Sequence, residues 1–246
     1  MFENGNQSRW YQTWWGVTLA GLGLLLLVAI ILIGATTIKY WWQLKNGQTT
    51  FFEANLKEFT ASRTAGVKAK VDRSKLEISD DPYLGRESAP ITIVEFADFK
   101  CPNSKASAPI IQEVARKFGY KVKIIVRDFP AESKFPGSSF LSQMAYCAQK
   151  QGKYWEMHRF LFENQDSLDD AFTADEVKTI AAKVGAEPNQ LASCSFSDEA
   201  IREVKLDFLA GVEAGVVGTP TFFVNGQKVE GSLPYEVWSK YLESVK

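Results

Sequence analysis

The sequence has few of the residues that build metal sites. It contains three cysteines and one histidine in 246 residues, too few and too scattered to supply the four ligands of a structural zinc site. We therefore expect no metal and no other cofactor. The sequence also lacks an excess of charge of either sign, because 28 Lys and Arg against 29 Asp and Glu give a formal net charge of -1. This balance argues against a nucleic-acid partner.

Charge is missing altogether from Trp10 to Ile38, and residues 17–38 are almost wholly apolar. A helix of that length spans about 33 Å, close to the thickness of one hydrocarbon core. Tryptophan and tyrosine side chains flank both ends, as they do at membrane interfaces. We therefore expect a retained signal anchor over residues 14–42, behind a short tail of residues 1–13. The alternatives are a buried core helix or a cleaved signal peptide, for which the run is long and no cleavage site follows.

The chain beyond the predicted anchor divides into a linker and one domain. Residues 43–80 mix charged and small residues with little periodicity and are expected to form the linker. Residues 81–246 have the length of a single domain. Near its start, residues 90–99 are rich in β-branched and aromatic side chains, which predicts a buried strand.

A helix should follow that strand and begin near Cys101. Pro102 suits its first turn, where a missing N–H costs nothing, and Gly119 should end it. A second strand is expected over residues 121–129, joined to the first by a right-handed parallel crossover. The remaining elements are, in order, a helical block over about 134–216, a hairpin that turns at Asn225 and Gly226, and a last helix over 234–244.

Three segments in this order resemble the DsbA-type thioredoxin-fold oxidoreductases, in particular the membrane-anchored bacterial branch related to BdbD. They are "DDPYLGRESAPITIVEFADFKCP", "GKYWEMHRFLFENQ" and "GTPTFFVNG". The resemblance covers about residues 78–246. It implies an α/β thioredoxin fold in which the helical block at about 134–216 is an insertion, preceded by one transmembrane helix.

The resemblance also implies a role for each matching position. Cys101 corresponds to the nucleophilic cysteine, and Pro102 and Asn103 to the dipeptide that follows it. Pro220 matches the cis-proline that lies opposite the cysteine. Thr219, just before that proline, would offer its backbone to pair with an extended substrate segment.

Glu95 matches the buried strand acid that assists proton transfer beneath the cysteine in this family. The residues alone leave plain alternatives for two of these positions. Glu95 could be a strand-end acid paired to Lys100 or Lys105. Pro220 could be a trans proline at the first residue of a strand.

The chain departs from the family at Ser104, where the family keeps a second cysteine. A helix N-terminus stabilises a thiolate, so we expect Cys101 to be reactive rather than a buried structural thiol. A serine cannot attack a mixed disulfide, so Cys101 and Ser104 cannot store a disulfide between them. What remains is isomerisation or monothiol reduction, resolved by a substrate thiol or a small thiol. Ser104 could still donate a hydrogen bond to the thiolate, or mark lost catalysis; an engineered cysteine-to-serine trap would look the same.

The other two cysteines, Cys147 and Cys194, both fall in the helical block. In an oxidising compartment they could form a structural disulfide that leaves Cys101 as the single reactive thiol. The alternatives are two buried free thiols, or a role for one of them in resolving a mixed disulfide on Cys101, which would need a large motion.

We therefore expect a single-pass bacterial membrane protein whose soluble domain is extracytoplasmic, because disulfide chemistry is most useful there. Basic residues flanking the apolar run, Arg9 before it and Lys39 and Lys45 after it, favour the opposite orientation slightly. The expected function is a monothiol disulfide isomerase or reductase for exported polypeptides with cysteines, served by a small thiol or a membrane redox partner. The alternative is a binding module that holds extended polypeptide near Pro220.

Overall fold

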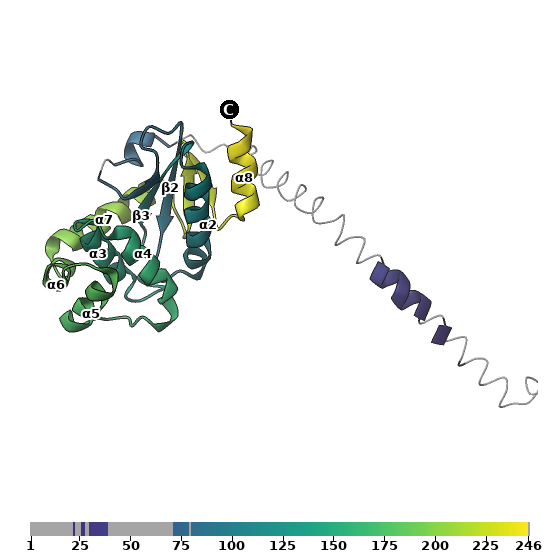
Figure 1. The fold of residues 1–246 in the computed structure, drawn as a ribbon, viewed down its shortest axis with the longest axis horizontal. Helices are drawn as coiled ribbons and strands as arrows, with labels where there is room; N and C mark the ends of the chain where they lie inside the picture. The colour runs from purple at the N-terminus through teal and green to yellow at the C-terminus, as the bar shows by residue number, and fades with distance from the viewer. Residues whose placement is uncertain (1–21, 23–25, 28–29, 39–70, 79, 246) are drawn as a thin grey trace, which may run out of the picture. The chain divides into compact units, whose positions relative to one another are not determined.

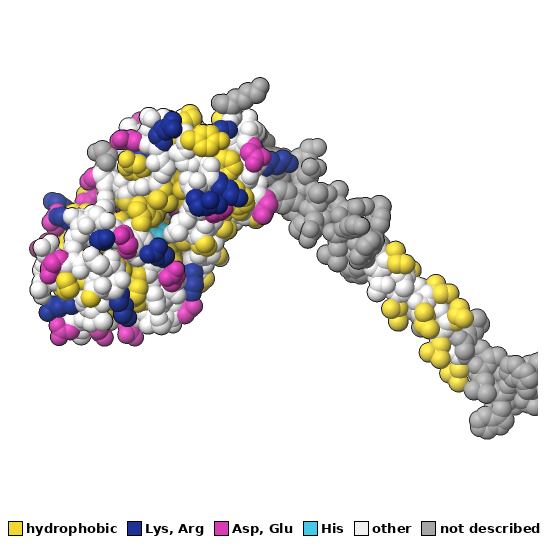
Figure 2. Space-filling view, in the orientation of Figure 1, with side chains coloured by type: hydrophobic (Ala, Val, Ile, Leu, Met, Phe, Trp, Pro, Cys, Tyr) yellow, Lys and Arg dark blue, Asp and Glu magenta, His cyan; other side chains and the backbone are white. Residues whose placement is uncertain are grey.

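The computed structural model describes residues 22, 26–27, 30–38, 71–78 and 80–245 (Figure 1). The chain divides into two compact units, residues 1–68 and 69–246. The described residues of the first unit are helical, and their leucine and isoleucine side chains are more than half exposed, as Figure 2 shows in yellow. Within the described residues, no helix is both long and apolar enough to cross a membrane. The predicted tail, most of the predicted anchor (14–42) and most of the predicted linker (43–80) lie outside the described residues.

The second unit is built on a five-stranded sheet with the strand order β1-β3-β2-β4-β5. Its strands are β1 (Tyr83–Gly85), β2 (Ile91–Ala97), β3 (Val122–Asp128), β4 (Thr221–Val224) and β5 (Gln227–Glu230). β2 and β3 are parallel and are joined by α2 (Pro102–Phe118), and the other neighbouring pairs are antiparallel. The predicted strand–helix–strand crossover and the final hairpin are therefore confirmed. Strand β1 was not predicted, because its three residues alternate only between exposed and half-buried.

Strand β2 lies at the centre of the sheet, and all seven of its residues are buried. On one face of the sheet, Ile93 packs with α2 and with Trp238 of α8 (Tyr235–Ser244). On the other face, Phe96 lies against α7 (Asp198–Glu213), which approaches so closely that a Cβ at Gly211 would stand 3.1 Å from the Phe96 ring. Burial on both faces explains the continuous apolar run of this strand in the sequence.

The helical insertion follows β3 and carries a core of its own. Its elements are α3 (Ser138–Gln149), α4 (Tyr154–Glu163), η3 (Gln165–Ser167), α5 (Ala174–Val184), α6 (Pro188–Ser195) and α7. α5 begins with a capping box, in which Thr173 and Glu176 each accept a hydrogen bond from the other's backbone N–H. The insertion is stapled by a disulfide between Cys147 of α3 and Cys194 of α6, with a Cα–Cα distance of 5.8 Å.

Residues 71–78, most of the described part of the predicted linker, belong to the second unit and pack against its other residues. The Val71 N–H donates to the Gly226 carbonyl at 3.2 Å, and Leu76 is 1% exposed in the cluster that contains Phe96. A short 3-10 turn, η2 (Arg73–Lys75), lies between them. This segment is therefore built into the domain whose sheet it touches.

Candidate active site

Cys101 lies in the turn between the end of β2 and the start of α2. It is the N-cap residue of α2, and Pro102 occupies the first turn of that helix as expected. The residue is 5% exposed, and its thiol donates a hydrogen bond to the Thr219 carbonyl at 3.2 Å. Thr219 precedes Pro220, and the peptide bond between them is cis. The fold thus brings together two segments that are 118 residues apart in the sequence.

The sulfur of Cys101 contacts a carbonyl oxygen rather than a hydrogen-bond donor. A carbonyl oxygen can accept a hydrogen from a thiol, but it offers nothing to a thiolate. The sulfur makes no capping hydrogen bond with the first-turn N–H groups of α2. In this arrangement the sulfur is engaged by the Thr219 carbonyl and not by the N-terminus of α2.

Ser104 is fully buried and does not hydrogen-bond to Cys101 among the contacts of the described residues. Its hydroxyl instead accepts a long hydrogen bond, 3.4 Å, from the backbone N–H of Asp98. Pro102 and Asn103, by contrast, are exposed. The dipeptide between positions 101 and 104 therefore faces solvent while the serine points into the domain.

Glu95 is buried on the face of the sheet that α2 covers. Burial raises the pKa of its carboxyl to about 8, and the Ser107 hydroxyl from α2 opposes only part of this increase. The alternative of a strand-end acid paired to a nearby lysine is wrong, because Lys100 pairs with Asp170 and Lys105 pairs with Asp166. Glu95 is therefore a neutral carboxyl at pH 7 that can exchange a proton close to that pH.

Asp98 is a site residue that the sequence analysis missed. Its buried carboxylate accepts hydrogen bonds from the backbone N–H groups of Lys100 and Ala131, each at 2.8 Å. Its carbonyl accepts from the Cys101 N–H at 3.0 Å. Burial raises the pKa of Asp98, and these N–H donors lower it in part. The signal in the sequence that could have identified it is an acidic residue between a buried strand and the Cys-Pro pair.

Gln165, at the start of η3, also reaches the Cys101 turn and was not predicted. Its side-chain amide donates to the Phe99 carbonyl at 2.8 Å and to the Cys101 carbonyl at 3.1 Å. Nothing in the sequence relates these residues, because the bonds join positions 66 and 64 residues apart.

The chain's one histidine, His158, packs inside the insertion. Its ring lies among the rings of Phe99, Tyr154, Trp155 and Phe162, and burial lowers its pKa to about 3. It is therefore neutral at physiological pH and serves as a core residue.

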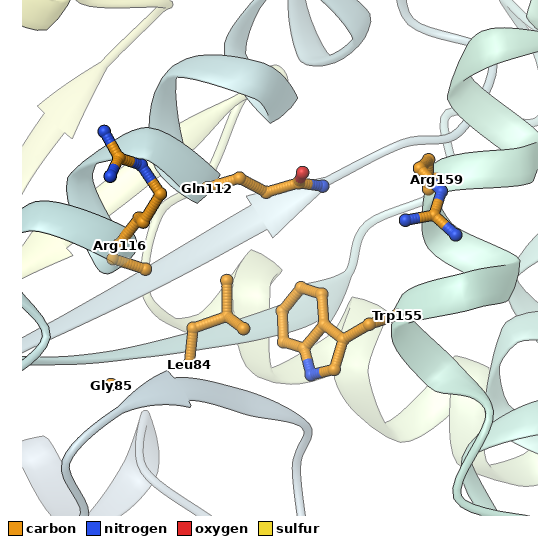
Figure 3. Close-up of a pocket in the computed structure, with 7 residues that line it drawn as sticks. Leu84, Gly85, Gln112, Arg116, Trp155 and Arg159 are labelled. Carbon is orange, nitrogen blue, oxygen red and sulfur yellow. The ribbon is translucent and has the colours of Figure 1, made fainter.

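Two cavities lie elsewhere in the second unit. Figure 3 shows one of about 310 Å³ between α2, α4 and β1, with Trp155 and Leu84 beside Gln112, Arg116 and Arg159. The other, about 210 Å³, is lined by several acids, including Asp81, Asp128 and Asp207. Burial raises the pKa of Asp81 to about 8 and that of Asp128 to about 7. Neither cavity is lined by a predicted site residue.

A family model described as thioredoxin matches residues 77–244. Among curated relatives, the Na⁺/H⁺ antiporter NhaA 3 of Salinispora tropica is 30% identical over 157 residues, which cover 64% of this chain and 23% of the antiporter. The antiporter NhaA 1 of Mycolicibacterium vanbaalenii is 30% identical over 158 residues, which cover 63% and 25%. The chain thus spans about a quarter of the length of these curated relatives.

Several solved structures share the fold. A thioredoxin-like oxidoreductase from Silicibacter pomeroyi is 25% identical with a TM-score of 0.60, covering 70% of this chain and 96% of that one. BdbD from Bacillus subtilis is 24% identical with a TM-score of 0.59, covering 68% and 93%. The thiol-disulfide exchange protein α-DsbA2 from Wolbachia pipientis is 19% identical with a TM-score of 0.61, covering 77% and 95%.

Proposed function

Because the chain belongs to the thioredoxin family, we propose that it is a thiol-disulfide exchange protein that works through Cys101 alone. The observation that carries this proposal is the contact between the Cys101 thiol and the carbonyl that precedes the cis bond to Pro220. A substrate strand that paired with Thr219 would compete for that carbonyl and free the thiol beside its own disulfide. Ser104, in the fourth position of the motif, limits the chemistry to one sulfur.

The proposed cycle begins when Cys101 loses its proton and attacks one sulfur of a substrate disulfide. The substrate S–S bond breaks, a mixed disulfide forms on Cys101, and the second substrate sulfur leaves as a thiolate. In isomerisation, another substrate thiolate attacks the substrate sulfur of the mixed disulfide and regenerates Cys101, with no net change in electrons. In reduction, two equivalents of a small thiol supply the two electrons and leave as its disulfide.

Glu95 is the proposed proton carrier of this cycle. With a pKa of about 8, its carboxyl is mostly protonated at pH 7 yet can release and regain a proton without a large cost. It lies on β2, the strand that leads into the Cys101 turn, and faces α2. This position, on the strand before the Cys101 turn and facing the helix that follows it, is the basis of the proposed role.

We further propose that residues 14–42 anchor the domain in a membrane, with the domain on the extracytoplasmic side and exported polypeptides as substrates. The apolar run, the disulfide between Cys147 and Cys194, and relatives named as Na⁺/H⁺ antiporters support this placement. A single cysteine introduced at the exposed Gln227 tests it in intact cells. Labelling by a membrane-impermeant maleimide supports the placement, whereas labelling only after permeabilisation contradicts it.

The function itself is tested by trapping. Without a resolving cysteine, the wild-type chain should accumulate mixed disulfides with substrate proteins, visible as bands that disappear on reduction. Ser104→Cys should reduce that accumulation, because a second thiol resolves the mixed disulfide. Cys101→Ala should form none and should not reactivate a scrambled-disulfide enzyme. If Cys101→Ala reactivates it as well as the wild type, the exchange function is excluded.

A non-catalytic binding module is the second candidate. It is favoured by one observation: Cys101 is only 5% exposed, so its thiol is largely closed to solvent. Under this function, Cys101→Ala should bind an unfolded, cysteine-free polypeptide as tightly as the wild type. Substituting the exposed Val217, which lies next to the cis-proline segment, with aspartate should weaken that binding.

A further inference from the structure

We infer that Gln165 is a positioning residue for Cys101. Its side-chain amide holds the turn that presents the thiol, by donating to the backbone carbonyls on either side of Lys100. The positioning role follows from the contacts alone. Only its purpose, to present a thiol for exchange, rests on the proposed function.

Both N–H groups of the Gln165 side-chain amide donate hydrogen bonds. An amide nitrogen carries two hydrogens, so the bonds to the Phe99 and Cys101 carbonyls, at 2.8 and 3.1 Å, can form at the same time. Gln165 is 8% exposed, so water offers little competition. Among the described residues it is the hydrogen-bond donor to the Phe99 carbonyl. The Cys101 carbonyl also accepts the first bond of α2, from the Lys105 N–H at 3.0 Å.

The same turn is held from its other side by Asp98. The N–H of Lys100 donates to the Asp98 carboxylate, while the carbonyl of the same peptide unit, that of Phe99, accepts from Gln165. The peptide unit between Phe99 and Lys100, one residue before Cys101, is therefore fixed at both ends. A buried turn held in this way has little freedom to rotate, so the direction of the Cys101 side chain is set by the insertion as well as by the sheet.

Neighbouring contacts connect the same two regions but cannot substitute for Gln165. The ion pairs of Lys105 with Asp166, at 2.5 Å, and of Lys100 with Asp170 have acidic partners that are 85% and 66% exposed. Exposed pairs of this kind contribute little. The buried contact of the Phe99 ring with Phe162 is apolar and fixes no carbonyl. The charged and titratable groups around the turn are Asp98, Lys100, Lys105, Glu132, Asp166 and Asp170, with Glu95 on the strand before it.

Two substitutions separate the donors from the shape of the side chain. Gln165→Leu removes both donors without adding charge. Gln165→Glu keeps the shape but places a carboxylate against two carbonyl oxygens and brings a negative charge to the turn. Both variants should stabilise a Cys101 thiolate less well than the wild type, and the glutamate variant least. The matched control is Gln149→Leu, because Gln149 donates in the same way to a backbone carbonyl, that of Asp80, away from the turn.

The measurement is the rate of Cys101 alkylation by iodoacetamide against pH on the full 246-residue chain, followed by mass spectrometry. Cys101 is the free cysteine, because Cys147 and Cys194 are bonded to each other. We expect alkylation at pH 7 to be at least about threefold slower in Gln165→Leu, with the midpoint of the profile about 0.5 pH unit higher. Gln165→Glu should shift further in the same direction, and Gln149→Leu should keep the wild-type profile.

A thermal melt by circular dichroism accompanies each profile, so that a fall in stability is separated from a change at the thiol. If both Gln165 variants keep the wild-type profile, or if Gln149→Leu shifts as much as Gln165→Leu, the positioning role is refuted. Should the leucine variant fail to fold, a wild-type profile in the isosteric glutamate variant refutes the role. Failure of the exchange function would appear separately, as wild-type Cys101 that is alkylated normally yet forms no mixed disulfide with a substrate.

Discussion

Glu95→Gln should stabilise the fold, and the gain should grow with pH. The folded-state pKa of Glu95 is about 8, against an ordinary value of 4.5 in the unfolded chain. Between these values the folded protein holds a proton that the unfolded chain has released. Stability from this residue is therefore intact below pH 4.5 and is lost as pH rises toward 8, by about 1.4 kcal/mol per pH unit. Glutamine keeps the shape of the neutral acid and removes this loss.

The expected gain follows from that slope. It is about 2 kcal/mol at pH 6, about 3 kcal/mol at pH 7 and up to about 5 kcal/mol at pH 8 and above. Urea denaturation at pH 5, 6, 7 and 8, followed by circular dichroism, gives the free energy of unfolding of both proteins. Asp81 and Asp128, whose raised pKa values also make stability depend on pH, are the same in both proteins and cancel in the difference.

The control makes the same substitution at the solvent-facing side of α2. Glu113 pairs with Arg116 at 2.7 Å, and this partner lowers its pKa to about 2, so Glu113 stays ionised across the whole range. Glu113→Gln should therefore show no gain that grows with pH. A difference between Glu95→Gln and wild type that is the same at pH 5 and pH 8 would refute the assignment of a raised pKa to Glu95.

Three further predictions concern stability. Replacing Cys147 and Cys194 with alanine opens a loop of 47 residues and should lower the free energy of unfolding, measured in urea, by about 4 kcal/mol. If the variant is also less stable than the reduced wild type, the loss comes from packing instead. Arg127→Met removes the guanidinium that bonds to Asp207 at 2.5 Å, so the free energy of unfolding at pH 8 should fall by about 3–5 kcal/mol. This loss should be smaller at pH 5, because the buried acids are then protonated. Equal losses at both pH values would contradict that account. Thr173→Ala removes the cap of α5 and should cost about 1 kcal/mol by the same assay, whereas no loss would mean that the helix end is satisfied by water.

The central part of the fold could be predicted because its signals are local. A β-branched run, a proline in the first turn of the helix that follows it and a glycine that ends that helix define β2 and α2 without any tertiary information. The Asn225-Gly226 turn is equally local, since both residues have positive φ, 47° and 83°. Strand β1 has no such signal, because it exists only through its pairing with β3.

The candidate site divides in the same way. Cys101, Ser104 and Pro220 stand in recognisable motifs, but the contact that joins two of these segments depends on the whole fold. The bonds of Gln165 to the Cys101 turn join separate elements, and no pattern within one segment encodes them. The burial of Asp98 follows from the loop at Ala131 that covers it. Contacts of this kind need the three-dimensional structure.

Glu95 also bears on which of the two candidate functions applies. A fully buried carboxyl with a pKa of about 8 destabilises the folded protein at neutral and alkaline pH. Binding of polypeptide alone does not require such a group. A cysteine that must lose and regain a proton in every cycle does have a use for it. Glu95→Gln should therefore lower the rate of disulfide isomerisation while the fold becomes more stable and polypeptide binding stays unchanged. A variant that is more stable and equally active would remove the proton-carrier role, and with it one of the reasons to prefer catalysis over binding.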